Sequence, residues 1–191
     1  MNLFFEQEIE NALGALRQGK TILYPTDTIW GLGCDATDAP AVQKLYEIKQ
    51  RPDSKSMIIL VAEEREILQY VAAPDLAVFD FIQEQTRPTT IIFENAIGLP
   101  ANLVAADGSV AIRIVQDAFC RHLIKRLRKP LVSTSANISG QPASQSFSQI
   151  PDAVKQQVDY VVQWRQDDTT PAQPSQIIKW NNNSEPTIIR K

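Results

Sequence analysis

Apolar residues recur along this chain with two periods, one typical of helices and one of strands. Spacings of three and four residues, as in Ile9, Leu13 and Leu16, predict amphipathic helices. The helices expected on this basis span residues 4–18, 39–49, 64–71, 76–85, 119–127 and, as a short piece, 148–154. Short apolar or β-branched runs bounded by Gly, Pro and polar residues predict strands at residues 21–24, 57–61, 89–93, 110–115, 131–132 with the polar residues that follow, 160–164, 177–180 and 187–189.

The order of these elements predicts an α/β fold with a mixed sheet. Strands and helices alternate in the first part of the chain, and strands dominate towards its end. The run MIILV at residues 57–61 is continuously apolar, which predicts a strand covered on both faces. Gly19 is expected to end the first helix, and Asp38 to cap the second. We expect a single domain over residues 1–191, because no repeat or long linker divides the chain.

Composition narrows the class of protein. The chain has 191 residues, of which 43% are hydrophobic and 21% charged, and its net charge is −3, ordinary values for a globular protein. No apolar run approaches the roughly 20 residues that span a bilayer, and no signal-peptide pattern opens the chain, so we expect a cytoplasmic protein without a membrane partner. Two cysteines without a CxxC motif and one histidine, His122, make a disulfide framework, a zinc site or a His-based nucleophile improbable. We therefore assign no protein metal ligands and expect His122 at the surface.

The segment after the first strand carries the first candidate chemistry. Thr26, Asp27 and Thr28 place two hydroxyls and a carboxylate just beyond the strand, and Gly31 and Gly33 allow a sharp turn or the close approach of a ligand. Ligands of open α/β sheets bind beyond the carboxyl ends of strands, which makes this segment a candidate site. Local capping by Thr26 and Asp27 explains the same pattern equally well.

A cluster of cations follows about twenty residues later, around Pro52. Lys49 suits the end of a helix, where the macrodipole is negative. Arg51 and Lys55 lie past that helix and directly before a buried strand, so the helix does not explain them. Cations fixed on a loop beside a sheet suit the phosphates of a nucleotide.

Two later segments add polar groups to apolar strands. Arg113 lies in an otherwise apolar strand, and either a salt bridge to an aspartate or a clamp on a ligand carboxylate accounts for it. The segment STSANISG, residues 133–140, offers hydroxyls and backbone N–H groups to phosphate or ribose oxygens. The chain has no GxxxxGK[ST] and no GxGxxG after a strand, so a nucleotide would be held by cations and by this turn.

A basic helix, RHLIKRLRK at residues 121–129, has two interpretations. One is an ordinary solvated helix face. The other is a local patch for RNA phosphates, whose binding would be weak and sensitive to salt because the chain as a whole is acidic.

Taken together, these segments resemble one family. YPTDT-x-x-GLGCDA, K-x-RP-x-x-K, VA-x-R and TSAN-x-SG occur in this order over nearly the whole chain, as in the Sua5/YrdC family of threonylcarbamoyl-AMP synthases. The resemblance implies a mixed twisted sheet with flanking helices around a positively lined cavity, in the short form without a C-terminal Sua5 domain. It also implies a nucleotidyltransferase that joins L-threonine, bicarbonate and ATP, with Mg²⁺ on the phosphates, into threonylcarbamoyl-AMP and pyrophosphate. The product serves the threonylcarbamoyladenosine modification of tRNA.

The resemblance further implies the residues of the site. The residues matching threonine contacts are Thr28, Arg113, Ser133 and Ser175. The residues matching ATP contacts are Lys49, Arg51, Lys55, Ser109, Ser135, Asn137 and Arg190. Of these, Lys49 and Arg51 are expected to be catalytic. The reaction needs positioning and charge neutralisation rather than a protein nucleophile, which agrees with the lack of a His or Cys motif.

Three positions along the chain depart from the family pattern, and one is Leu60, where histidine is frequent. Arg-Pro-Thr-Thr at residues 87–90 stands where Pro-Gly-Pro-x-Thr is usual, and we expect Arg87 to fill part of the cavity or to contact a phosphate. Ser175-Gln176 stands where a Ser-Thr pair is usual. A diverged paralogue is therefore an alternative, as is a non-catalytic protein of the same fold that binds double-stranded RNA or the ribosome. The tRNA and the tRNA threonylcarbamoyl transferase complex are expected partners, and the sequence leaves the oligomeric state open.

Overall fold

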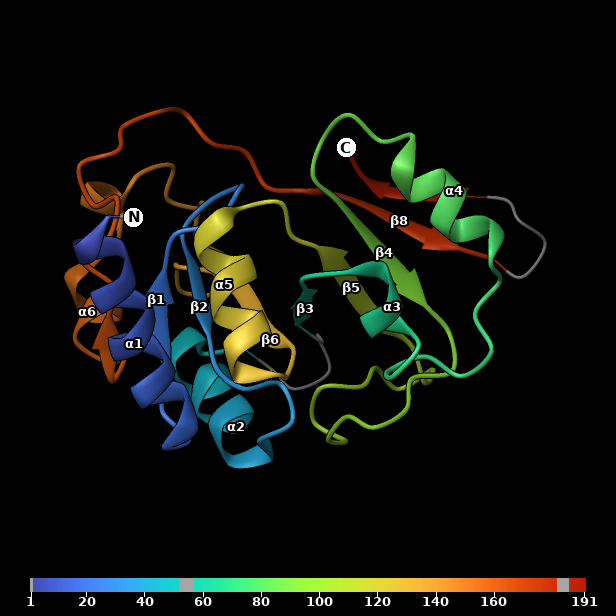
Figure 1. Cartoon of the computed structure of the whole chain (residues 1–191), viewed down its shortest axis with the longest axis horizontal. Coiled ribbons are helices and arrows are strands. Elements are labelled where there is room, and N and C mark those ends of the chain that lie inside the picture. Colours follow the sequence, from blue (N-terminus) through green and yellow to red (C-terminus); the bar gives the residue numbers. More distant parts are fainter. Residues whose placement is uncertain (1, 52–56, 182–185) are drawn as a thin grey trace.

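Helices and strands alternate along the chain in the computed structural model, which describes residues 2–51, 57–181 and 186–191 (Figure 1). The helices are α1 (Leu3–Arg17), α2 (Ala39–Lys49), α3 (Glu64–Ile67), α4 (Ala77–Gln83), α5 (Ala118–Leu127), α6 (Asp152–Lys155) and the 3₁₀ turn η1 (Phe147–Gln149). The strands are β1 (Ile22–Tyr24), β2 (Gly31–Gly33), β3 (Ile58–Val61), β4 (Thr89–Phe93), β5 (Val110–Ile114), β6 (Leu131–Ser135), β7 (Tyr160–Val161), β8 (Gln176–Trp180) and β9 (Pro186–Arg190).

The described strands form one mixed sheet, in the order β7-β1-β2-β6-β3-β5-β4-β8-β9. Three neighbouring pairs are parallel, namely β1 with β7, β3 with β5 and β4 with β8. The other neighbouring pairs are antiparallel. The prediction of a mixed rather than a purely parallel sheet is confirmed.

The sheet separates two layers of apolar side chains. Leu23 belongs to the cluster that includes the apolar side chains of α2, whereas Ile22 and Tyr24 belong to the cluster that includes those of α1 and α5. Successive residues of a strand point to opposite faces, so β1 is covered on both sides. In Figure 1, α1 and α5 lie on the face of the sheet that is turned towards the viewer. The same alternation holds in β3, where Leu60 joins the α1 and α5 layer while Ile59 and Val61 join the other, as the run MIILV predicted.

Strand β2 was not predicted, because its two glycines were interpreted as a turn or a ligand approach. The structure gives a packing reason for them instead. A Cβ on Gly33 would lie 2.6 Å from Cε1 of Tyr24 and would also meet the carbonyl oxygen of Val132. The Tyr24 ring therefore lies across β2, and its hydroxyl donates to that same carbonyl at 3.0 Å. The missing side chain leaves room for this ring.

Several predicted elements are shorter than expected. The helices predicted at 64–71 and 76–85 reduce to α3 and α4, and that predicted at 148–154 divides into η1 and α6. The strand predicted at 160–164 is reduced to β7, because the Gln163 N–H donates to Glu8 Oε2 at 2.6 Å and leaves the strand pairing. The Asp38 cap is confirmed, since its carboxylate accepts from the Ala41 N–H at 3.1 Å. Among the described residues, no helix is long and apolar enough to cross a membrane.

Candidate active site

A row of four side chains paired across adjacent strands forms the floor of a cavity of about 290 Å³. The four, from β6, β3, β5 and β4 in turn, are Ser133, Ile58, Ala111 and Ile92. Leu60, two residues beyond Ile58 on the same face, lies under α1 and α5. The helices therefore cover one part of this face and leave the neighbouring part open as the cavity.

Three arginines line this cavity from three different elements. They are Arg51 after α2, Arg113 on β5 and Arg190 at the end of β9. Among the described residues that line the cavity there is no Asp or Glu. Cations without lining carboxylates make the cavity a site for anions.

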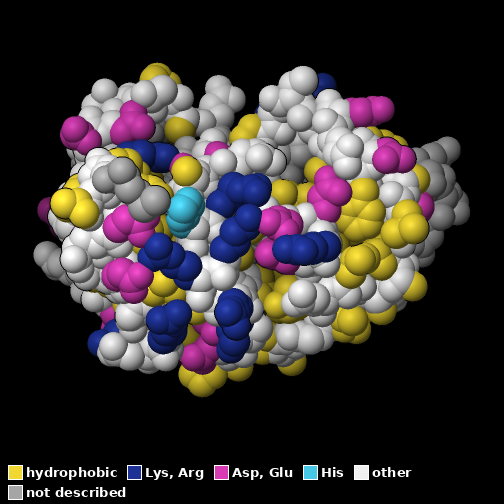
Figure 2. Space-filling view, viewed as in Figure 1, with side chains coloured by type: hydrophobic (Ala, Val, Ile, Leu, Met, Phe, Trp, Pro, Cys, Tyr) yellow, Lys and Arg dark blue, Asp and Glu magenta, His cyan; other side chains and the backbone are white. Residues whose placement is uncertain are grey.

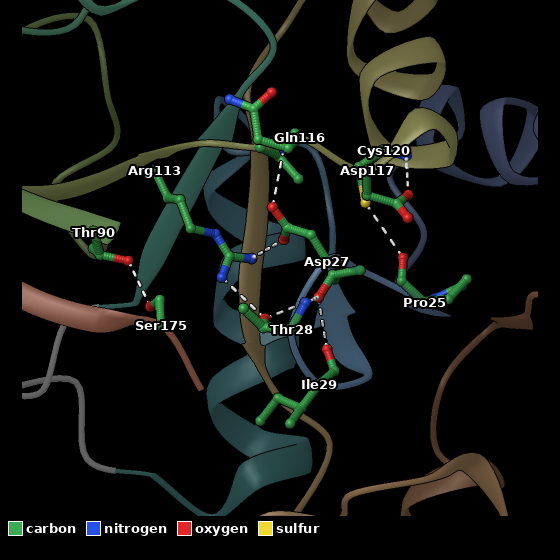
Figure 3. Close-up of polar contacts among 12 residues, drawn as sticks. Pro25, Asp27, Thr28, Ile29, Thr90, Arg113, Gln116, Asp117, Cys120 and Ser175 are labelled. Carbon is green, nitrogen blue, oxygen red and sulfur yellow. Dashed lines mark hydrogen bonds and ion pairs between the residues drawn. The ribbon is translucent and has the colours of Figure 1, made fainter. Parts of the chain in front are cut away.

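Arg113 is held from one side by the segment between β1 and β2 (Figure 3). Its Nη2 forms an ion pair with Asp27 Oδ1 at 3.2 Å, and its Nη1 donates to Thr28 Oγ1 at 2.9 Å. Asp27 in turn accepts from the Gln116 N–H at 3.0 Å, which ties this segment to the end of β5. The salt bridge considered for Arg113 is thus present. Its buried Nε has no hydrogen-bond partner among the described residues.

Lys49 does not line the cavity but holds the turn that does. Its Nζ donates to the carbonyl oxygens of Ser135 at 2.6 Å and Asn137 at 2.8 Å, and the side chain is almost fully buried. The Ser139 N–H returns a bond to the Lys49 carbonyl at 2.8 Å. The end of α2 and the turn after β6 are thereby joined into one unit. Burial, with a smaller contribution from Arg51, lowers the pKa of Lys49 to about 8.

The other two arginines of the cavity are also affected by their surroundings. Burial lowers the pKa of Arg51 from its usual value. The pKa of Arg190 is lowered first by burial and then by the charge of Arg113. Arg190 is fixed by two bonds from Nε and Nη2 to the Ser175 carbonyl, at 3.1 and 2.7 Å. Two guanidinium groups that repel each other across a cavity favour an anion between them.

The structure brings most of the predicted site residues to the cavity. Those that line it are Thr28, Arg51, Arg113, Ser133, Ser135, Ser175 and Arg190. Those that do not line it are Lys49, Ser109 and Asn137. Ser109 donates to Asp107 Oδ1 at 2.6 Å, and Asn137 donates to the carbonyl oxygens of Ile138 and Gln141 within its own turn. Lys55 lies outside the described residues.

Some residues at the site were not assigned a role from the sequence. Apolar side chains of the wall include Trp30, Met57 and Ile189, which a sequence does not distinguish from core residues. Arg165, which follows the strand predicted at 160–164, donates to the Thr26 carbonyl at 2.8 Å and pairs with Asp117, the cap of α5. It ties the segment between β1 and β2 to the start of that helix.

The sequence as a whole matches a known family over most of its length. A family model for Sua5, YciO and YrdC, described as "Telomere recombination", matches residues 14–191. The chain belongs to this family.

Curated members of the Sua5/YciO/YrdC family are similar to the chain over most of their length. A threonylcarbamoyl-AMP synthase of Idiomarina loihiensis is 35% identical over 179 residues, which cover 91% of this chain and 94% of that protein. Another, of Sodalis glossinidius, is 34% identical and covers 75% of this chain and 77% of that protein.

Solved structures of the family share the fold. P. abyssi Sua5 complexed with L-threonine superposes with a TM-score of 0.85 at 24% identity, over 97% of this chain and 54% of that one. E. coli YciO superposes with a TM-score of 0.84 at 23% identity, over 97% of this chain and 89% of that one. This chain thus spans about half of the Sua5 chain, and the YrdC-like fold predicted from the motifs is confirmed.

Two of the departures from the family pattern, at residues 87–90 and 175–176, lie against each other. The Gln176 amide donates to the Thr89 hydroxyl, with 2.5 Å between the two atoms, and the Thr90 and Ser175 hydroxyls are 2.8 Å apart (Figure 3). Arg87 is exposed and does not line the cavity, so the expectation that it fills the cavity or contacts a phosphate there is wrong. The two changed segments therefore bond to one another, and Ser175 also holds Arg190 through its carbonyl.

The basic face of α5 is largely paired with acidic side chains. Figure 2 shows Lys and Arg side chains gathered over this helix with Asp and Glu between them. Lys125 pairs with Glu63 at 2.6 Å, Lys129 with Asp35 at 3.2 Å, and Arg126 with two glutamates of α1. His122 is exposed beside them, as expected. This surface is distinct from the cavity, because none of these side chains lines it.

Proposed function

We propose that this protein is a threonylcarbamoyl-AMP synthase, which joins L-threonine, bicarbonate and ATP into threonylcarbamoyl-AMP and pyrophosphate. The observation that carries the proposal is a cavity with three arginines, hydroxyl groups and no lining carboxylate among the described residues. Such a cavity suits substrates that bring a carboxylate and a triphosphate. The curated relatives bear the name of this activity.

Arg113 is the proposed ligand of the threonine carboxylate. Its Nη atoms are oriented by Asp27 and Thr28, and its side chain lines the cavity. A guanidinium fixed in this way suits a carboxylate that enters the cavity. Ser133 and Ser175 lie in the same cavity, where their hydroxyls are available to the rest of the amino acid.

Arg51 and Arg190 are the proposed ligands of the ATP phosphates. Both enter the cavity from outside the four-strand floor, and Ser135 adds a hydroxyl beside them. Lys49 supports this region without lining the cavity, since its ammonium binds backbone carbonyls of residues 135 and 137. Negative charge on the α-phosphate rises when the carbamate oxygen attacks and pyrophosphate leaves, so fixed guanidinium groups stabilise that transition state.

The proposed reaction also involves Mg²⁺, and its product is expected to pass to downstream partners. The described residues contain no group of three or more His, Cys, Asp or Glu side chains that could hold a metal. Mg²⁺ in this proposal is therefore carried by the phosphate oxygens of ATP and by water, and no step is assigned to it. The product would be passed to the tRNA threonylcarbamoyl transferase complex and thence to tRNA.

The test is pyrophosphate release by purified protein supplied with ATP, L-threonine and bicarbonate. We expect release only when threonine is present, and a loss of about 100-fold or more in Arg51→Ala, the size typical of a removed transition-state donor. The matched control is Arg87→Ala, which removes an exposed arginine outside the cavity and should retain activity. Threonine-independent release, or an active Arg51→Ala variant, contradicts the proposal.

A further inference from the structure

Three residues between β1 and β2 share a closed set of hydrogen bonds beside Arg113. The Thr26 hydroxyl donates to the Ile29 carbonyl at 2.8 Å and accepts from the Thr28 N–H at 3.0 Å. The Thr26 and Thr28 hydroxyl oxygens are 3.0 Å apart, and Arg113 Nη1 donates to Thr28 Oγ1 at 2.9 Å. Thr26 itself is buried, with 3% of its surface exposed.

The direction of the bond between the two hydroxyls follows from counting protons. A hydroxyl has one proton and two lone pairs. The single proton of Thr26 goes to the Ile29 carbonyl, because a carbonyl oxygen only accepts. The bond between the hydroxyls must therefore use the proton of Thr28, which fills the second lone pair of Thr26.

Thr28 is left with one unused lone pair and no proton to give. Its proton points to Thr26, and one lone pair accepts from Arg113. Thr28 lines the cavity, so what it presents to a ligand there is a hydrogen-bond acceptor. A free threonine hydroxyl would rotate and present either polarity.

We propose that Thr26 is a positioning residue that fixes the Thr28 hydroxyl as an acceptor for the amine of the amino-acid substrate. This inference rests on the proposed function. If Arg113 binds the carboxylate, the nearest donor in an α-amino acid is the amine on the adjacent carbon, and Thr28 is the polar side chain 2.9 Å from that guanidinium.

The fixed polarity has a consequence for the reaction. Bicarbonate supplies carbon dioxide, and the neutral amine attacks its carbon with the nitrogen lone pair. An N–C bond forms and one C=O electron pair moves to oxygen. The amine then loses a proton to water. A hydroxyl that donated to the amine would occupy this lone pair. A hydroxyl that only accepts binds an N–H instead and leaves the lone pair available for attack.

The experiment compares Thr26→Val with Thr26→Ser, because valine removes the hydroxyl at nearly the same size and serine keeps it. Each variant and the unaltered protein are assayed for threonine-dependent pyrophosphate release, with separate KM values for threonine and ATP. Two competitive inhibitors with the same carbon skeleton show whether the Thr28 hydroxyl donates or accepts a hydrogen bond. L-2-Aminobutyrate brings a donor amine, and 2-oxobutyrate brings an acceptor carbonyl at the same carbon.

We expect the unaltered protein and Thr26→Ser to bind 2-aminobutyrate more tightly than 2-oxobutyrate, by about 10-fold, the worth of one hydrogen bond to a charged group. In Thr26→Val the Thr28 hydroxyl is free to rotate and can either donate or accept, so this ratio should fall several-fold. The KM for ATP should stay within about twofold, since Thr26 does not line the cavity. Threonine KM should rise and kcat should fall together.

Three results would overturn the inference. An equal weakening of both competitors in Thr26→Val would show that Thr26 only supports the local fold. A preference of the unaltered protein for 2-oxobutyrate would show that Thr28 donates, and this measurement needs no variant. If the unaltered protein releases no pyrophosphate with threonine, the proposed function fails first, and the inference falls with it.

Discussion

Lys49 shows how a residue can belong to a site without facing its ligand. The family resemblance implied an ATP contact for Lys49, while its place at the end of a helix gave a second explanation. In the structure the ammonium is directed at two backbone carbonyls of the turn after β6. The orientation of the Lys49 side chain depends on the direction in which the backbone leaves α2 and on the burial of the ammonium. The motif shows neither. Removing the lysine should therefore loosen the turn rather than remove a charge from the cavity wall.

The depressed pKa of Lys49 predicts a pH dependence of stability. Burial lowers this pKa from 10.5 to about 8 in the folded protein, so the unfolded chain binds more protons between these values. The contribution of Lys49 to the free energy of unfolding is complete above the unfolded pKa and is lost as the pH falls through about 8. Urea unfolding of the unaltered protein and Lys49→Met from pH 7 to pH 10.5 measures it.

The difference between these two proteins should grow with pH by at most about 3 kcal/mol, since one pKa unit corresponds to about 1.4 kcal/mol. Lys49→Met should be less stable throughout, because two carbonyls lose their donor. All other titrating groups are common to both proteins and cancel in the difference. Curves that stay parallel would mean that the folded pKa of Lys49 is not lowered.

At the scale of the elements, the sequence predicted what local pattern determines. The apolar run of β3 and the Asp38 cap of α2 were evident because each depends on neighbouring residues in the chain. Strand β2 was not evident, since two glycines in three residues disfavour a strand. It forms because β1 and β6 pair with it on either side, and because the Tyr24 ring occupies the space that side chains would fill.

The same limit applies to the site. The motifs, through the family they resemble, identified seven residues that line the cavity. They did not reveal the register that aligns Ser133, Ile58 and Ala111 into its floor, since strand pairing brings together residues far apart in the chain. They also misplaced Arg87, which is exposed and does not line the cavity.

Gly33→Ala tests the packing explanation of β2. An added methyl group would collide with the Tyr24 ring and the Val132 carbonyl, so we expect a loss of about 1–3 kcal/mol in the free energy of unfolding, as for other overpacked cores. The matched control is Gly14→Ala in the middle of α1, where no atom lies within 4 Å of the added carbon. That substitution should stabilise by about 0.5–1 kcal/mol. Equal effects of the two changes in urea unfolding would refute the explanation.

At the scale of the whole molecule, charge is divided between two surfaces. The cavity gathers three arginines without lining carboxylates among the described residues. The face of α5 carries more cations, but its lysines are matched by acidic neighbours, and the ammonium of Lys125 lowers the pKa of Glu63. Exposed pairs of this kind contribute little to stability, and they reduce the local positive potential. The division favours a function in the cavity over an RNA-binding role of the helix.

Reversing the charge of the helix separates these two roles. Arg121→Glu combined with Lys125→Glu places two carboxylates on α5 beside Glu63, yet neither changed residue lines the cavity. If the cavity carries the function, threonine-dependent pyrophosphate release should stay within about twofold of the unaltered protein, because like charges on the exposed helix act over no more than roughly one Debye length in physiological salt. If α5 carries it, the double variant should lose binding to double-stranded RNA while Arg51→Ala retains that binding. Measuring both pyrophosphate release and RNA binding for each variant, with urea unfolding to show that each is folded, makes the outcomes of the two hypotheses opposite.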